Sequence, residues 1–182
     1  MNIIDTDVIT VAGICSFRLF NEWGDATILL REIYDKKHYL FCVEPLSWED
    51  AVRKSCESLM KDGTVDETYA EEIIACIRKH GPYIVILPGL ALPHSTEKAK
   101  GAHATAIGFM KTAVPVHFEG GNPAKDAQVF FTLSSTNPDE HLNNMQRLYS
   151  VLTNEKALEM LKRIEKPEEL LEIDRLFGEL QE

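Results

Sequence analysis

Residues 81–95, GPYIVILPGLALPHS, constrain the fold of this chain more than any other segment. The opening Gly-Pro pair ends a helix, because glycine suits a helix C-cap and proline cannot continue the hydrogen-bond ladder. The run 83–87 is apolar and rich in β-branched residues, which predicts a strand buried on both faces. A second Pro-Gly pair turns the chain, and Pro93 fixes the backbone before His94. The segment therefore predicts an imidazole held at the end of a rigid, apolar element.

The charge balance of the chain narrows the classes of partner. Its 182 residues carry a formal net charge of −10, with 26% charged and 45% hydrophobic residues. This composition is that of one globular domain with a sizeable core. Nucleic acids and anionic membrane surfaces both attract basic proteins, so neither is favoured as a partner. A protein partner with a basic docking face fits the charge.

The cysteines and the N-terminal segment indicate the compartment. Cys15, Cys42, Cys56 and Cys76 are scattered, without the close spacing of a metal or redox motif. We expect reduced thiols, and we expect Cys56 and Cys76 to be buried because they fall at apolar helix positions. The apolar run 8–17 follows two aspartates and is shorter than the roughly 20 apolar residues of a membrane span. The expectation is a cytoplasmic chain without signal peptide or membrane insertion.

Helix and strand signals alternate early in the chain, and helices cluster at its end. Ser47 and Asp66 are predicted N-caps of two amphipathic helices, and Pro167 suits the first position of the last helix. Helices are predicted at 47–62, 66–80, 138–152, 155–164 and 167–180, and strands at 83–87, 103–110, 114–118 and 127–134. This order predicts an α/β fold of three layers, α/β/α, with a central mixed sheet. Residues 1–28 are an extension of unknown role before a domain at 29–182.

A second histidine stands at the start of a predicted helix. Asn137 is a good N-cap, Pro138 suits the first helical position, and Glu140 can close a capping box. His141 then lies in the first turn, on a helix face whose apolar residues point toward the domain. Spacing alone favours an ordinary, partly buried histidine that bonds a nearby carbonyl. A helix N-terminus nevertheless presents free N–H groups that suit an anion and lower the pKa of an imidazole.

The sequence of residues 81–96, GPYIVILPGLALPHST, resembles the phosphorylation-site signature of one family of bacterial domains. These are the mannitol/fructose-type (type 2) enzyme IIA domains of the sugar phosphotransferase system (PTS), and the L-ascorbate-type branch is most similar. The resemblance covers residues 29–180 and implies the mannitol-type IIA fold, with His94 as the phosphoacceptor. Two departures bear on access and substrate. Ser95 stands where relatives often have Gly or Ala, and residues 98–101 differ from the Pro-Glu-rich turn of ascorbate-type members.

The same resemblance implies further site residues. The family carries a second active-site histidine at the position of His141, where it would orient or stabilise the phosphoryl group. Arg78 lies as far before His94 as a basic residue that some members place beside that group, and a guanidinium matches phosphate geometry. A solvated helix end explains Arg78 equally well, and Lys79 could take the role instead. Thr96 matches a hydroxyl residue of related His-Gly-Thr sequences and would donate a hydroxyl or N–H group to the phosphate.

The activity that the resemblance implies is a covalent phosphoryl relay. A neutral nitrogen of His94 would attack the phosphoryl group of the phosphocarrier protein HPr, and phospho-His94 would pass it to a cognate IIB component acting with IIC. The sugar would be ascorbate-like or another pentitol or hexitol. No metal, nucleotide or other cofactor is required, and the sequence has no GxxxxGK[ST] loop. Ile86, Leu90 and Leu92 are expected to form an apolar docking surface, and a homodimer stays open.

Two other classes of function stay open. One is a regulatory phosphoacceptor whose state is recognised by protein contact, without sugar transport. The other is a binding-only module of the same fold, as in the cytoplasmic domains of some anion exchangers, although the ALPH motif and His141 argue against it. A zinc site formed by His94, His103, His117 and His141 is disfavoured, because no pair has the close spacing of common zinc motifs.

Overall fold

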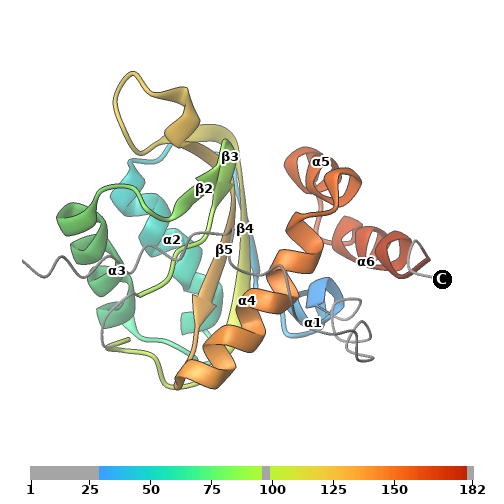
Figure 1. Cartoon of the computed structure of the whole chain (residues 1–182), viewed down its shortest axis with the longest axis horizontal. Coiled ribbons are helices and arrows are strands. Elements are labelled where there is room, and N and C mark those ends of the chain that lie inside the picture. The colour runs from blue at the N-terminus through green and yellow to red at the C-terminus, as the bar shows by residue number, and fades with distance from the viewer. Residues whose placement is uncertain (1–28, 96–98, 180–182) are drawn as a thin grey trace, which may run out of the picture.

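The structure is a computed structural model that describes residues 29–95 and 99–179. Within these residues the chain forms six α-helices, one short 3₁₀ helix and five strands (Figure 1). In chain order they are α1 (Leu29–Asp35), β1 (Tyr39–Cys42), α2 (Trp48–Met60), α3 (Glu67–His80), β2 (Val85–Leu87), β3 (Gly89–Ala91), β4 (Ala106–His117), η3 (Pro123–Lys125), β5 (Asp126–Ser134), α4 (Pro138–Leu152), α5 (Glu155–Arg163) and α6 (Glu169–Glu179). The extension 1–28 and the helical turn expected at 97–100 lie wholly or partly outside the described residues.

The five strands form one mixed sheet in the order β1-β4-β5-β3-β2. β1 is parallel to β4 and β3 is parallel to β5, whereas the pairs β4–β5 and β2–β3 are antiparallel. Because β3 and β5 run in the same direction, their carboxyl ends meet at one end of the sheet. The chain that follows β3 therefore lies beside the chain that follows β5, which leads into α4.

Helices cover both faces of this sheet, which confirms the predicted three-layer α/β/α fold (Figure 1). α2 and α3 pack on one face, and α1, α4, α5 and α6 pack on the other. A hydrophobic core lies on each face of the sheet, and successive residues of β4 pack alternately into one core and the other, as expected for a strand buried on both faces. Phe109 packs with Phe131 and the α4–α6 side, while Met110 packs with Phe130 and the α2–α3 side. All four side chains are 0% exposed.

The predicted helix caps are confirmed where local signals are strong. The Ser47 hydroxyl accepts the Asp50 N–H at 3.1 Å, and the Asp66 carboxylate accepts the Thr68 N–H at 2.8 Å. These bonds satisfy backbone donors that have no partner within the helix. The last helix is the exception, because α6 begins at Glu169 and not at the proline two residues earlier.

Two strand predictions are wrong in detail. The segment 83–87 is not a strand buried on both faces, because only Val85–Leu87 forms β2 and this strand is at the edge of the sheet. Ile86 and Leu87 are 45% and 42% exposed as a result. The two strands expected at 103–110 and 114–118 are one long strand, β4, whose pairing with β5 shifts register between Lys111 and Val116. α1 and β1 carry no strong local signal and were not predicted.

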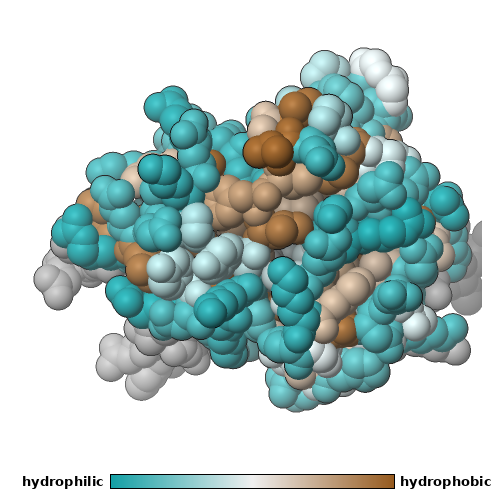
Figure 2. All heavy atoms as spheres, turned by 180° about the vertical axis from the view of Figure 1, so that it is seen from behind, coloured by the Kyte–Doolittle hydropathy of each residue, from teal (hydrophilic) through white to brown (hydrophobic). Residues whose placement is uncertain are grey.

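The surface of the molecule is mixed in character. Figure 2 shows a run of hydrophobic side chains between hydrophilic margins on the side turned away in Figure 1. None of the described helices is long and apolar enough to cross a membrane. Cys56 and Cys76 are buried, as predicted, and neither forms a disulfide. Burial raises the pKa of the Cys56 thiol to about 12. A thiol with so high a pKa is inert at neutral pH.

Candidate functional site

The backbone on both sides of Pro93 is held by the sheet. The Leu92 N–H donates to the Ile84 carbonyl at 2.8 Å, and the Pro93 carbonyl accepts the Leu133 N–H at 2.9 Å. These bonds continue the β2–β3 and β3–β5 pairings past the last residue of β3. His94 follows immediately and is half-buried. The predicted placement of an imidazole at the tip of a rigid element is therefore what the structure has.

Two neighbours fix the orientation of the His94 ring. Its Nδ1 lies 2.7 Å from the Leu92 carbonyl oxygen, which can only accept a hydrogen bond. The proton of the neutral ring is therefore on Nδ1, and the lone pair is on Nε2. The Tyr83 hydroxyl donates to the His94 carbonyl at 2.6 Å, and the Tyr83 ring meets the imidazole edge-on at 5.3 Å between centroids. The lone pair on Nε2 is therefore not engaged by the Leu92 carbonyl.

The second predicted histidine lies next to the first. The ring centroids of His94 and His141 are 5.9 Å apart, with the planes tilted by 39°. His141 belongs to the first turn of α4, and the Glu140 beside it ties this turn to the start of β4. The Glu140 carboxylate accepts hydrogen bonds from the Thr105 and Thr136 hydroxyls. The helix that carries His141 is therefore attached to the sheet at the end where His94 lies.

Burial keeps both imidazoles neutral. It lowers the pKa of His94 below the ordinary value of 6.5, and repulsion from His141 acts in the same direction. The hydrogen bond to the Leu92 carbonyl opposes this shift but does not cancel it. Burial alone lowers the pKa of His141 from 6.5. Two positive charges on neighbouring, half-buried rings are energetically unfavourable. At neutral pH each ring is therefore uncharged and has one lone pair and one N–H group.

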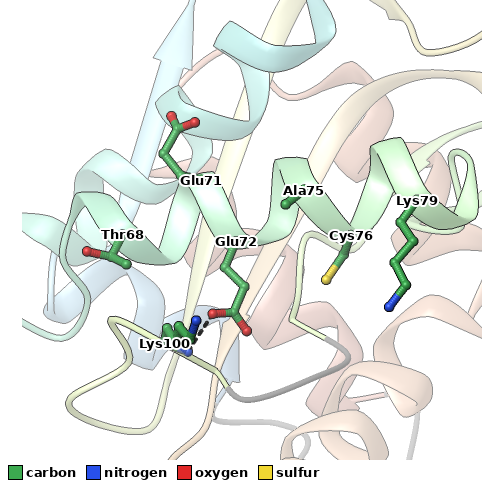
Figure 3. A pocket seen from close by; sticks show the side chains of 7 residues that line it. All are labelled: Thr68, Glu71, Glu72, Ala75, Cys76, Lys79 and Lys100. Atoms are coloured by element: carbon green, nitrogen blue, oxygen red, sulfur yellow. Dashed lines mark hydrogen bonds between the residues drawn. The ribbon is translucent and has the colours of Figure 1, made fainter.

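The basic residues at the end of α3 point in different directions. The Arg78 guanidinium lies 3.6 Å from the Glu49 carboxylate and 6.0 Å from the centroid of the Trp48 ring, and both partners belong to α2. A contact with a group on His94 would require Arg78 to leave both. Lys79 extends from the same side of α3 as Glu72, opposite the side chain of Glu71 (Figure 3). Thr96, the remaining predicted site residue, lies outside the described residues.

A groove of about 440 Å³ runs along α3 on the side of Lys79 (Figure 3). It is lined by Thr68, Glu71, Glu72, Ala75, Cys76, Lys79 and Lys100. Glu72 accepts the Ser95 hydroxyl at 2.7 Å and the Lys100 N–H at 3.0 Å. The Ser95 N–H lies 3.4 Å from the Tyr69 hydroxyl, which donates to the Leu133 carbonyl. The residue after the histidine is therefore fastened to α3 by its side chain and its backbone.

The expected apolar docking surface is largely buried. Leu90 and Leu92 are 0% and 2% exposed and belong to the core, so only Ile86 of the expected docking surface is accessible. His103 pairs with Asp66 and His117 pairs with Asp126, each at 2.8 Å. In the residues that the structure describes, no group of three or more His, Cys, Asp or Glu side chains is arranged to hold a metal ion.

Sequence reasoning missed three residues of this neighbourhood. Tyr83 was expected only as part of a strand, yet it contacts the His94 ring and backbone. The Leu92 carbonyl and the Glu72 carboxylate were not expected to contribute. One signal could have identified Tyr83: its hydroxyl is the one polar side-chain group in the apolar run 83–87, and a buried tyrosine hydroxyl needs a hydrogen-bond partner nearby. The other two depend on folded geometry and leave no local signal.

Known proteins with similar sequences are enzyme IIA components. The mannitol-specific cryptic phosphotransferase enzyme IIA component of Escherichia coli (strain K12) is 28% identical over 126 residues, which are 69% of this chain and 84% of that protein. The ascorbate-specific PTS system EIIA component of Shigella flexneri is 26% identical over 136 residues, 72% of this chain and 86% of that protein. The motif at residues 81–96 resembles the same mannitol/fructose-type family, and the second of these relatives is from the ascorbate-type branch that the motif favours.

Solved structures give the same result for the fold. The solution structure of the mannitol-specific cryptic phosphotransferase enzyme IIA from Escherichia coli matches with a TM-score of 0.71 and 25% identity. The match covers 80% of this chain and 97% of the chain in the solved structure. The family model for EIIA 2 of the phosphoenolpyruvate-dependent sugar phosphotransferase system matches residues 32–174, which include both histidines of the site. The chain belongs to the type 2 EIIA family of the phosphoenolpyruvate-dependent sugar phosphotransferase system.

Proposed function

We propose that the chain is a phosphoryl relay that accepts phosphate on His94 from phospho-HPr and passes it to a cognate IIB component. The single observation that carries this proposal is the pairing of His94 with His141, with the His94 ring fixed by the Leu92 carbonyl. A neutral, oriented imidazole with a free Nε2 is a competent nucleophile at neutral pH. Membership of the EIIA family supports the reaction class, a phosphotransfer.

The transfer balances without a cofactor. The Nε2 lone pair of His94 forms a bond to phosphorus while the P–N bond of the donor phosphohistidine breaks. The donor ring, protonated on its other nitrogen, takes that electron pair and leaves as a neutral imidazole, so the positive charge passes from the donor ring to the His94 ring. With hydrogen on Nδ1 and phosphorus on Nε2, the His94 ring becomes positively charged. The hydrogen bond from Nδ1 to the Leu92 carbonyl is then charge-assisted and stabilises the ring in the phosphorylated state. The reverse steps deliver the group to the acceptor.

His141 is the proposed partner of the phosphoryl oxygens. Because burial lowers its pKa, its ring is neutral and can donate one N–H to the phosphate. Arg78 or Lys79 would supply a cation, and Lys79 extends from the same side of α3 as Glu72, whose carboxylate binds Ser95. Thr96 would add a hydroxyl or N–H donor. These three roles follow the family resemblance and are to be tested one by one.

The proposed partners and sugar follow from the relatives. HPr would be the donor and a IIB component the acceptor, and IIB would act with the IIC transporter on an ascorbate-like sugar or another pentitol or hexitol. The two relatives named above are mannitol-specific and ascorbate-specific, which keeps both classes of substrate open. At a net charge of −10 the chain suits donor and acceptor proteins with basic docking faces.

Intact mass spectrometry after incubation with phosphoenolpyruvate, enzyme I and HPr tests the proposal. We expect one acid-labile phosphoryl adduct on the wild-type chain, no adduct on His94→Ala, and slower labelling of His141→Ala. Addition of the cognate IIB component should remove the adduct from the wild-type chain. If the wild-type chain stays unmodified while a known IIA protein is labelled in the same tube, the relay proposal is wrong.

A further inference from the structure

Glu72 joins the two ends of the segment that follows the phosphoacceptor. Its Oε1 accepts the Ser95 hydroxyl at 2.7 Å, and its Oε2 accepts the Lys100 N–H at 3.0 Å. One carboxylate on α3 therefore binds the chain at Ser95, directly after His94, and again at Lys100 (Figure 3). Hydrogen bonds to an ionised carboxylate are shorter and stronger than bonds between neutral groups.

The Ser95 side chain is bound from two sides. Its hydroxyl donates to Glu72 and accepts the Ala99 N–H at 3.3 Å. Ala99 has φ of +46°, a left-handed conformation that is unfavourable for a residue with a Cβ. A strained residue persists only where the surrounding structure holds it, and here Ser95 and Glu72 supply the bonds on either side of it. The serine that departs from the family pattern is thus the residue that Glu72 binds.

We propose that Glu72 is a positioning residue for phosphoryl transfer: its carboxylate binds Ser95, the residue directly after His94, together with Lys100, and so holds His94 in position. Small displacements of a reacting group cost large factors in rate, because the reacting atoms must be aligned. Loss of the carboxylate should therefore lower the rate of transfer at His94 without weakening the binding of the donor protein. This inference rests on the proposed function, since it presupposes that His94 is phosphorylated.

The neighbouring glutamate provides a matched control. Glu71 lies on the same helix and lines the same groove, but its carboxylate pairs with Arg53 of α2 at 2.6 Å. Figure 3 shows the side chain of Glu71 on the opposite side of α3 from that of Glu72. A Glu71→Gln variant removes one negative charge from α3 without touching Ser95 or Lys100, so it separates a charge effect from a positioning effect.

The test is the steady-state transfer of phosphate from phospho-HPr through His94 to the cognate IIB component, with kcat and KM for phospho-HPr determined separately. For Glu72→Ala we expect kcat to fall by about tenfold or more while KM for phospho-HPr stays within about twofold. Ser95→Ala should lower kcat in the same way, Ser95→Thr should restore it because it keeps the hydroxyl, and Glu71→Gln should match the wild type. The double variant Glu72→Ala/Ser95→Ala should be about as slow as Glu72→Ala alone, since Glu72→Ala already removes the contact between the two side chains.

Hydrogen exchange at the Lys100 amide gives a readout that does not depend on phosphorylation. Glu72→Ala should speed this exchange and Glu71→Gln should leave it unchanged. A wild-type kcat for Glu72→Ala, or a higher KM with unchanged kcat, would overturn the positioning role. If the wild-type chain is not phosphorylated at all, the proposed function is wrong. Unchanged hydrogen exchange at the Lys100 amide in Glu72→Ala would in addition show that Glu72 does not hold this part of the chain.

Discussion

Gly101 occupies a position that no other residue fits, next to the segment that Glu72 holds. Its φ is +79°, in the region that L-residues with a Cβ rarely adopt. A Cβ added there would collide with Asp66 Oδ1, lie 2.6 Å from the Tyr69 backbone nitrogen and lie 3.1 Å from Thr68 Cβ. These atoms belong to the N-cap and first turn of α3, and the Gly101 carbonyl also accepts the Asp66 N–H at 2.9 Å.

The cost of Gly101→Ala can be estimated from two contributions. A left-handed conformation costs a residue with a Cβ about 1–2 kcal/mol. Insertion of a methyl group into a packed site costs about 1–3 kcal/mol. The collision cannot be relieved by moving Asp66 freely, because that carboxylate caps α3 through the Thr68 N–H. We therefore expect Gly101→Ala to lower the free energy of unfolding by about 2–5 kcal/mol in total.

Gly63→Ala is the matched control. Gly63 has φ of +77°, almost the same as Gly101, but a Cβ added there would meet no atom within 4 Å. Only the conformational cost applies, so the two variants should differ by the steric contribution of about 1–3 kcal/mol. Urea unfolding followed by circular dichroism gives both values from the midpoints and slopes. Equal losses for the two variants would refute the assignment of the larger cost to the contact with α3.

Two further predictions concern the site. Because burial lowers the pKa of His94 and His141 from 6.5, an NMR titration of the rings should place both midpoints below 6.5. The unfolded chain then binds more protons than the native state as the pH drops through 6.5, so the free energy of unfolding should fall in that window. A midpoint for His94 at or above 6.5 would contradict the burial argument. Asn137→Ala removes the side-chain oxygen that accepts the Glu140 N–H at 2.9 Å. We expect a loss of about 1 kcal/mol in urea unfolding, largely restored by Asn137→Ser, and an unchanged stability of Asn137→Ala would show that the cap is not needed.

The parts of the fold that the sequence predicts are those set by neighbours along the chain. Ser47, Asp66 and Asn137 cap helices at the expected positions because a cap depends on a few successive residues. The status of β2 could not be predicted in this way. An apolar run looks the same in a central strand and at an edge, and only the strand order decides how many of its faces and sides are covered. The register shift within β4 depends on β5 for the same reason.

The candidate site could be predicted only in part. The ALPH motif identifies His94 through family resemblance, and a capping pattern places His141 at a helix start, but spacing cannot show that the two rings meet. Their contact depends on the parallel pairing of β3 with β5, which is long-range in sequence. The role of Arg78 stays a prediction: its guanidinium lies beside Glu49 and Trp48, and the residue count that suggested a phosphate contact could not predict these two neighbours. Counting residues along a helix does not fix which neighbour a side chain reaches.

The chemistry of His94 follows from contacts that different elements supply. The tautomer comes from the Leu92 carbonyl, the ring orientation from Tyr83, and the second imidazole from α4. Each of these groups reaches the histidine only when β3 pairs with β5 and with β2, because the same pairings fix the backbone around Pro93. The oriented His94 ring beside a second imidazole is thus a property of the assembled end of the sheet. If the proposed function holds, loss of that pairing should abolish phosphorylation of His94 even where the helices remain folded.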